Sequence, residues 1–157
     1  MENNMDRMTY EQVRAMLLSC GERIIRNEPY LTRVDSAIGD GDHGIGMKNG
    51  MQAARRYLET AENEQNVYAL YANMASAMQA AMGGASGMIF STLFAGKAAE
   101  HAPASAITPK ELAEQMRDGL QAIQELGHAE VGDKTMVDAL APAVEAMLAH
   151  TDSFAGM

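Results

Sequence analysis

Residues 67–82 have the sequence VYALYANMASAMQAAM, in which large apolar side chains recur every three or four positions. These side chains are Val67, Leu70, Tyr71, Met74, Met78 and Met82. Because an α-helix turns once in about 3.6 residues, this spacing gathers them along one side of a helix. The stretch therefore predicts a helix that buries one face in a core.

The same period continues on both sides of this stretch and predicts five further helices. They run from about Tyr10 to Asn27, from about Met47 to Leu58, from Ser86 to about Glu100, from Pro109 to near Gly127, and from about Lys134 to His150. The helix after Ser86 is apolar almost all round, so we expect it to be central. Pro142 is expected to kink the last helix because proline removes the hydrogen bond to Asp138. The tail from Thr151 to Met157 is expected to be frayed.

Capping signals mark the starts of two of these helices. Thr9 is followed by Gln12 at the spacing of a capping box, and Thr108 is followed by Glu111 at the same spacing. No segment alternates in the manner of a strand. Six helices joined mostly by short loops predict an all-α antiparallel bundle, with residues 1–157 in a single domain.

The composition restricts the classes of function. The chain has 157 residues, 47% of them hydrophobic, and a formal net charge of −9. A protein this acidic has no basic face for nucleic acid, yet it can hold a nucleotide if divalent cations stand between its carboxylates and the phosphates. No apolar run reaches the length of a membrane span, and the first residues do not resemble a signal peptide. A cytoplasmic protein without membrane contact is therefore expected.

Residues 28–46 carry the strongest chemical signal. They show no sustained period, and they contain four glycines and the three aspartates Asp35, Asp40 and Asp42. We therefore expect a long connection whose glycines allow the tight turns that aim three carboxylates at one point. Mg²⁺ prefers such oxygen ligands. A calcium-binding EF-hand does not fit, because Ile45 stands where that motif has its glycine. The alternative is that Asp35 and Asp42 only cap helices in a solvated turn.

Two glycine-containing segments stand before predicted helices. In Gly83-Gly-Ala-Ser-Gly87, backbone N–H groups and the helix dipole would suit a phosphate, although close packing of helices is the alternative. In Gly132-Asp-Lys-Thr-Met136, Asp133 could instead cap the following helix. For His43, two interpretations stay open: a loop histidine with satisfied hydrogen bonds, or a residue that contacts a nucleotide or metal. Three other histidines are expected to be solvated: His101, His128 and His150.

Three segments, taken together, resemble one known family. They are Ile38-Gly-Asp-Gly-Asp-His-Gly44, Gly83-Gly-Ala-Ser-Gly87 and Gly132-Asp-Lys-Thr-Met136. In this order and at these separations they look like the L subunit of dihydroxyacetone kinase, over nearly the whole chain. The resemblance implies a barrel of eight antiparallel amphipathic helices that holds ADP or ATP at one end through two magnesium ions. About six of those helices are expected here, with the family's C-terminal helices absent from these residues.

The resemblance also implies a role for individual residues. Those implied as magnesium ligands are Asp35, Asp40 and Asp42. Those implied to line the nucleotide site are His43, Gly44, Ile45 and Gly46, with Ala85 and Ser86 at the phosphates and with Gly127 and Met136 at the base and sugar. No catalytic residue is expected with certainty in this chain, because the family's phosphoryl transfer needs positioning and charge neutralisation more than a protein nucleophile.

The implied activity is transfer of phosphate to dihydroxyacetone or another short ketose held on a separate K subunit. Some family members use ATP directly, and in others a phosphotransferase-system protein rephosphorylates bound ADP; both regimes stay open. The resemblance thus implies a kinase subunit that acts with a partner, in a homo-oligomer or hetero-complex. Two alternatives also stay open: a related kinase subunit acting on a fatty acid bound to a partner protein, and a non-catalytic helical interaction domain. The histidine after Asp42 favours the sugar-kinase branch.

Overall fold

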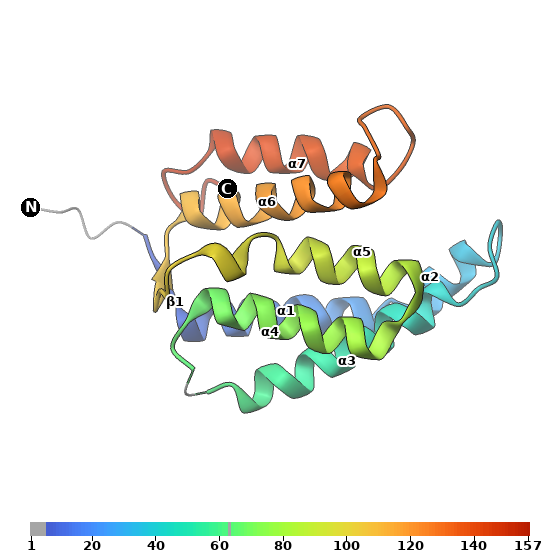
Figure 1. The fold of residues 1–157 in the computed structure, drawn as a ribbon, viewed down its shortest axis with the longest axis horizontal. Helices are drawn as coiled ribbons and strands as arrows, with labels where there is room; N and C mark the ends of the chain where they lie inside the picture. Colours follow the sequence, from blue (N-terminus) through green and yellow to red (C-terminus); the bar gives the residue numbers. More distant parts are fainter. Residues whose placement is uncertain (1–5, 63) are drawn as a thin grey trace, which may run out of the picture.

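The computed structural model describes residues 6–62 and 64–157 (Figure 1). Within these residues it has seven α-helices, one 3₁₀ helix and one pair of short strands. The helices are α1 (Tyr10–Arg26), α2 (Glu28–Asp35), α3 (His43–Thr60), α4 (Val67–Met82), α5 (Gly84–Ala95), η1 (Ala98–Glu100), α6 (Pro109–Gly127) and α7 (Val137–Ala149). The strands are β1 (Met8–Thr9) and β2 (Ala106–Ile107). The predicted all-α fold is confirmed, with seven α-helices where six were expected.

Two helices begin at the predicted capping boxes. At α6, the Thr108 hydroxyl accepts a bond from the Glu111 N–H, and the Glu111 carboxylate accepts one from the Thr108 N–H. Thr9 and Gln12 make the same reciprocal pair at α1. Each box satisfies backbone donors that a helix start leaves without partners. α4 covers the stretch from which the helical pattern was first evident.

The prediction of a long connection over residues 28–46 is wrong. Its first part forms α2 and its last part belongs to α3, so only residues 36–42 connect the two helices. α1 ends at Arg26, and Pro29 lies in the first turn of α2. A proline is tolerated there because the N–H that it lacks would have no partner in the helix.

A close contact at Gly44 holds α2 against α3. A Cβ atom built on Gly44 would lie 2.5 Å from the Glu28 carbonyl oxygen and 2.6 Å from the Thr32 backbone nitrogen. Both atoms belong to the backbone of α2, so a side chain at this position would force the helices apart. Glycine therefore allows α2 to pack on the first turn of α3. This packing fixes the position of the C-terminal end of α2, where the connection of residues 36–42 begins.

α5 lies between α4 and α6, in the central place that its composition predicts (Figure 1). It is shorter than expected, because Gly96 adopts a positive φ of 48° and ends it before η1. It is also not buried all round, since Met88 is 47% exposed. α7 begins at Val137 instead of near Lys134, whose φ of 60° is left-handed.

The core consists of two apolar clusters that meet at α5. The larger cluster is built mainly from α1, α3 and α4, and the smaller from α5, α6 and α7. Phe90 of α5 packs against both. The smaller cluster has five buried members: Leu93, Leu120, Ile123, Val137 and Val144.

Two other expectations about the chain are wrong. β1 and β2 form an antiparallel pair, with Met8 opposite Ile107, although no strand was predicted; two residues are too few to show alternation. The tail is not frayed, because Phe154 and Met157 pack against the larger cluster. The Phe154 N–H also donates to the Asp6 carboxylate at 3.0 Å.

The antiparallel order of the helices brings three connections to one end of the bundle. These are the α2–α3 connection, the α4–α5 junction and the α6–α7 loop, all at the right of Figure 1. One of the three motifs found in the sequence begins in each of them. We call the end with the three connections the motif end.

In the described part of the chain, no helix combines the length and apolarity that crossing a bilayer requires.

Candidate functional site

Three carboxylates converge at the motif end. Asp35 is the last residue of α2, Asp40 lies in the connection, and Asp42 immediately precedes α3. One oxygen from each of the three lies within 4.8 Å of the others. Mg²⁺ binds oxygen ligands at about 2.0–2.1 Å in octahedral geometry, so opposite ligands stand about 4.2 Å apart. The three oxygens therefore fit a hard divalent cation after a small inward movement, with waters or phosphate oxygens as further ligands.

Two glycines let the connection bring these carboxylates together. Gly41 has a φ of 80°, a conformation that residues with a side chain rarely adopt. Gly39 donates its N–H to the Asp35 carbonyl at 2.6 Å, and a Cβ atom there would collide with the Asp35 carboxylate. The turn is therefore tight because glycine permits both a left-handed backbone and a close approach.

A capping hydrogen bond is present for Asp35 and absent for Asp42. The Asp35 carboxylate accepts a hydrogen bond at 3.2 Å from the His43 N–H, at the start of α3. Asp42 occupies the N-cap position, yet its side chain makes no capping bond. Asp35 thus stabilises the helix start, and this role leaves its other lone pairs available to a cation.

The crowding of like charges has an electrostatic consequence. The pKa of Asp42 is raised, chiefly by repulsion from Asp40 and by a side-chain hydrogen bond with it, with a smaller repulsion from Asp35. The nearby His43 acts in the opposite direction. Such a cluster favours binding of a cation, because the cation cancels the repulsion that otherwise resists full ionisation.

A cavity of about 300 Å³ lies beside the carboxylates, between the starts of α3 and α5. His43 Nδ1 lies 3.2 Å from Ser86 Oγ, so a hydrogen bond connects the aspartate segment to the glycine-rich segment. Gly83 and Gly84 have φ values of 64° and 60°, which turn the chain sharply into α5. The residues that line the cavity are Asp42, His43, Gly46, Met82, Gly83, Gly84, Ala85 and Ser86.

Chemically, the cavity can hold a polyanion. The first N–H groups of α5 have no partners within the helix, and they carry the positive end of its dipole. Exposed carboxylates on the opposite side would repel a phosphate unless a divalent cation stood between them. The arrangement therefore suits a phosphate group together with its metal ion better than either alone.

The remaining predicted site residues lie outside the cavity wall. Gly44 is buried against α2, and Ile45 is half exposed on α3. Gly127 ends α6, where an added Cβ would lie 3.9 Å from Ile89 of α5. Met136 precedes α7 and packs against the smaller cluster, as does Ile89. The structure thus places all of these residues at the motif end, and their contacts with a nucleotide stay predictions.

Sequence reasoning misassigned the residues that shape the α6–α7 loop. Asp133 does not cap α7, because its carboxylate accepts a bond from the Glu130 N–H at 2.8 Å. The Thr135 hydroxyl accepts from the Val137 N–H, while the Asp138 carboxylate accepts from the Thr135 N–H. A threonine followed three residues later by an acidic residue is a capping signal, and it would have revealed this pair.

His101 was also misjudged, since it is not simply solvated. Its ring stacks on Tyr68 at 4.3 Å between centroids, and its Nε2 lies 3.6 Å from the Asp118 carboxylate. The Arg117 guanidinium lies 3.1 Å from the same carboxylate. Asp118 is buried, so the Arg117 guanidinium compensates a charge that would otherwise be costly there.

Comparisons with known proteins agree with the three motifs. A family model described as the DAK2 domain matches residues 37–156. The ADP-binding subunit DhaL of the PTS-dependent dihydroxyacetone kinase from Lactococcus lactis is 38% identical over 117 residues, which are 74% of this chain and 58% of that subunit. DhaL of the PEP-dependent enzyme from Escherichia coli is 34% identical over 136 residues, 87% of this chain and 64% of that subunit. The chain therefore spans about three fifths of the length of these relatives.

A solved structure extends the likeness to the fold. The dihydroxyacetone kinase from C. freundii, in complex with AMP-PNP and Mg²⁺, superposes with a TM-score of 0.76 at 25% sequence identity. The superposition covers 94% of this chain and 27% of that enzyme. The resemblance inferred from the three motifs is thereby confirmed, and the chain belongs to the DAK2 domain family.

Proposed function

We propose that this chain is the nucleotide- and magnesium-binding part of a dihydroxyacetone kinase. The observation that carries the proposal is the convergence of Asp35, Asp40 and Asp42 beside a cavity closed by the start of α5. The names of the relatives specify ADP binding, and the similar solved structure holds AMP-PNP and Mg²⁺. We infer that two magnesium ions and ADP or ATP occupy the corresponding place here.

Each part of the site has a distinct task in this proposal. The three carboxylates hold the cations, and the backbone at Ala85 and Ser86 orients the phosphates at the start of α5. Bound magnesium would neutralise the charge of the phosphoryl group during its transfer. His43, fixed by Ser86 on one side and by the Phe90 ring at 5.9 Å between centroids, would define the edge of the nucleotide site. Gly127 and Met136 would border the base and sugar.

A partner is proposed to carry the phosphoryl acceptor. Phosphoryl transfer depends mainly on positioning and charge neutralisation, so this chain can act without a nucleophile of its own. The acceptor would be a short ketose on a K-type subunit. The phosphoryl donor would be ATP itself or a phosphotransferase-system protein that regenerates it from bound ADP.

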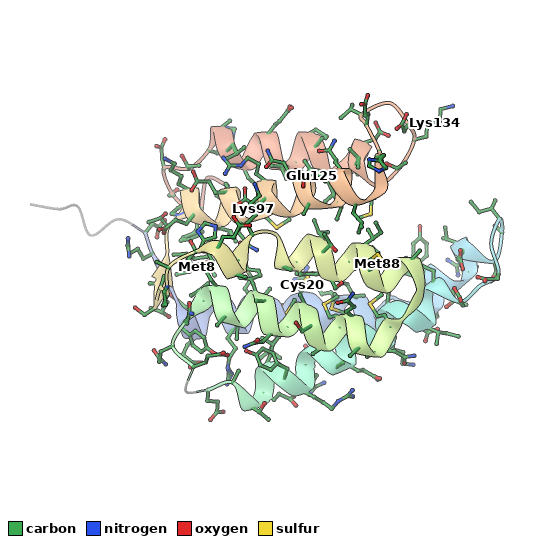
Figure 2. All side chains as sticks on the ribbon, in the orientation of Figure 1. Met8, Cys20, Met88, Lys97, Glu125 and Lys134 are labelled. Atoms are coloured by element: carbon green, nitrogen blue, oxygen red, sulfur yellow. The ribbon has the colours of Figure 1, made fainter. Side chains whose placement is uncertain are left out.

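The distribution of exposed apolar side chains supports a protein partner at the motif end. The large apolar side chains that are exposed in the described residues all belong to α2, the connections at this end, or the helix turns beside them. We call them the apolar rim: Tyr30, Val34, Ile38, Ile45, Met88, Leu126 and Val131. Figure 2 shows Met88 on α5 and, beyond it, Lys134 on the outermost loop of the same end. Such a concentration is typical of a surface that another protein covers.

Magnesium-dependent nucleotide binding is the direct test. We expect calorimetric titration to show that ADP and ATP bind at least about tenfold more tightly with Mg²⁺ than with EDTA, because the carboxylates repel phosphates unless a cation bridges them. AMP, which lacks the phosphates that share the cations, is the matched ligand control and should bind weakly under both conditions. Equal binding with and without Mg²⁺, or none, would contradict the proposal.

Replacing Ile38 with aspartate tests the apolar rim. Ile38 is 97% exposed, so the change should not disturb the fold. We expect the affinity for a K-type subunit, measured by biolayer interferometry with Mg²⁺ and ADP present, to fall by about tenfold or more. Ala15→Asp adds the same charge on the exposed side of α1, and it should leave that affinity unchanged. A rim variant that binds the subunit as tightly as the unmodified chain would remove the rim from the interface.

A further inference from the structure

The α6–α7 loop has an unusual backbone for its sequence. Gly132 has a φ of 105°, and Lys134 has a φ of 60° although it carries a side chain. Residues other than glycine avoid this region because Cβ approaches the following carbonyl oxygen. Such a conformation persists only where neighbouring contacts hold it, and it is concentrated near ligand sites. The loop therefore needs a group that fixes its shape.

The Asp138 carboxylate is that group. One oxygen accepts the Gly132 N–H at 2.6 Å, and the other accepts the Thr135 N–H at 3.1 Å. The two bonds span the left-handed positions, with Lys134 between their donors. The pKa of Asp138 is lowered, chiefly by the bond from Gly132, so the carboxylate is ionised and accepts these bonds as a charged group.

The held loop is connected to the cavity through α5. Met136, which follows the loop, packs against the smaller cluster together with Phe90. The Phe90 ring in turn lies 5.9 Å from the ring of His43, which lines the cavity. The loop also lies at the same end of the bundle as the aspartates (Figure 1). A change in the loop therefore has a continuous packed route to the wall of the site.

We propose that Asp138 is a positioning residue of the nucleotide site. It does not touch the nucleotide; its carboxylate fixes the Gly132–Met136 loop, and the loop holds Met136 against the smaller cluster, which supports α5 at the cavity. The inference rests on the proposed function, since it concerns the same nucleotide. It assigns a role to a side chain that lies outside both the carboxylate cluster and the cavity lining.

Asp138→Asn tests this role. Asparagine keeps the shape of the side chain but offers one acceptor oxygen, and it turns an NH₂ group toward the second backbone N–H. We expect the affinity for ADP with Mg²⁺ to fall by about tenfold, the loss of one charge-assisted hydrogen bond. Binding of Mn²⁺ alone, followed by electron paramagnetic resonance, should not change. Amide hydrogen exchange should accelerate at Gly132 and Thr135 and stay the same in α3 and α4.

Two further variants make the test specific. Glu145→Gln removes an equal charge from an exposed position of the same helix, and it should leave the ADP affinity unchanged. Gly132→Ala disturbs the loop independently, because alanine resists a φ of 105° while its Cβ meets no atom within 4 Å. It should lower the ADP affinity in the same way as Asp138→Asn, and it provides the test if that variant does not fold.

The outcomes separate this inference from the proposed function. If the unmodified chain binds ADP with Mg²⁺, and the Asp138 and Gly132 variants bind it equally well despite faster exchange of the loop amides, Asp138 has no positioning role. The same conclusion holds if Glu145→Gln weakens binding as much as Asp138→Asn. Failure of the unmodified chain to bind any nucleotide would overturn the proposed function and this inference with it.

Discussion

Replacement of Asp40 with asparagine is expected to abolish magnesium-dependent nucleotide binding, lowering the affinity for ADP by more than about 100-fold. Changes outside the ligand shell of a metal already cost about 10–100-fold, so loss of a ligand should cost more. Asp40 is the suitable position because it is exposed, and because the hydrogen bond that its carboxylate accepts from the Asp42 N–H at 3.4 Å can also be accepted by the asparagine oxygen. The measurement is calorimetric titration of ADP at fixed Mg²⁺.

The same variant has a second expected property. Without Mg²⁺ it should be at least as stable to heat as the unmodified chain, because repulsion from Asp40 is the main cause of the raised pKa of Asp42. Loss of binding without loss of stability distinguishes a ligand from a structural residue. Asp152→Asn removes an equal charge from the tail and should leave both properties unchanged. Retained magnesium dependence in the Asp40 variant would show that the cations lie elsewhere.

Gly44→Ala is expected to lower the free energy of unfolding by about 2 kcal/mol, within the range for overpacking of a close contact. The added methyl group would approach the backbone of α2 at Glu28 and Thr32, neither of which can rotate away. Thermal unfolding measures the effect, and a loss of this size lowers the melting temperature of a chain this long by roughly 4–8 °C. Because α2 carries Asp35, we also expect weaker magnesium binding.

Gly46→Ala is the matched control for stability. It makes the same substitution two residues later on α3, where an added Cβ has no atom within 4 Å. There, only the better helix propensity of alanine acts, so stability should rise by up to about 1 kcal/mol. If both variants changed stability equally, the contact between α2 and α3 would not be as close as the structure shows.

The fold was predictable where local signals are strong. α4 has four regular turns of apolar spacing, and α6 has a capping box with a proline in its first turn, so both were predicted close to their bounds. α2 was missed because eight residues give barely two turns of pattern. Its packing depends on Gly44, a contact with another element that no local pattern reveals.

The separate motifs of the candidate site were predictable from the sequence, but the contacts between them were not. The spacing of Asp35, Asp40 and Asp42 suggested a shared cation, and the structure brings their oxygens together. The bond between His43 and Ser86 joins residues 43 positions apart, so it depends on how α3 and α5 pack. From the sequence, Asp138 was named only as the residue whose helical hydrogen bond is lost at Pro142. Its position three residues after Thr135 was the capping signal that predicts its contact with the loop.

The pairing of β1 with β2 has a consequence for the order of assembly. From α3 onward, each long helix packs on the next one in the chain, so these contacts close short loops. Met8 and Ile107, by contrast, are 99 positions apart. Bringing them together confines far more chain and costs more entropy before any contact compensates it. β1 is therefore expected to pair with β2 only after the bundle has formed, and to be the first element to separate from it.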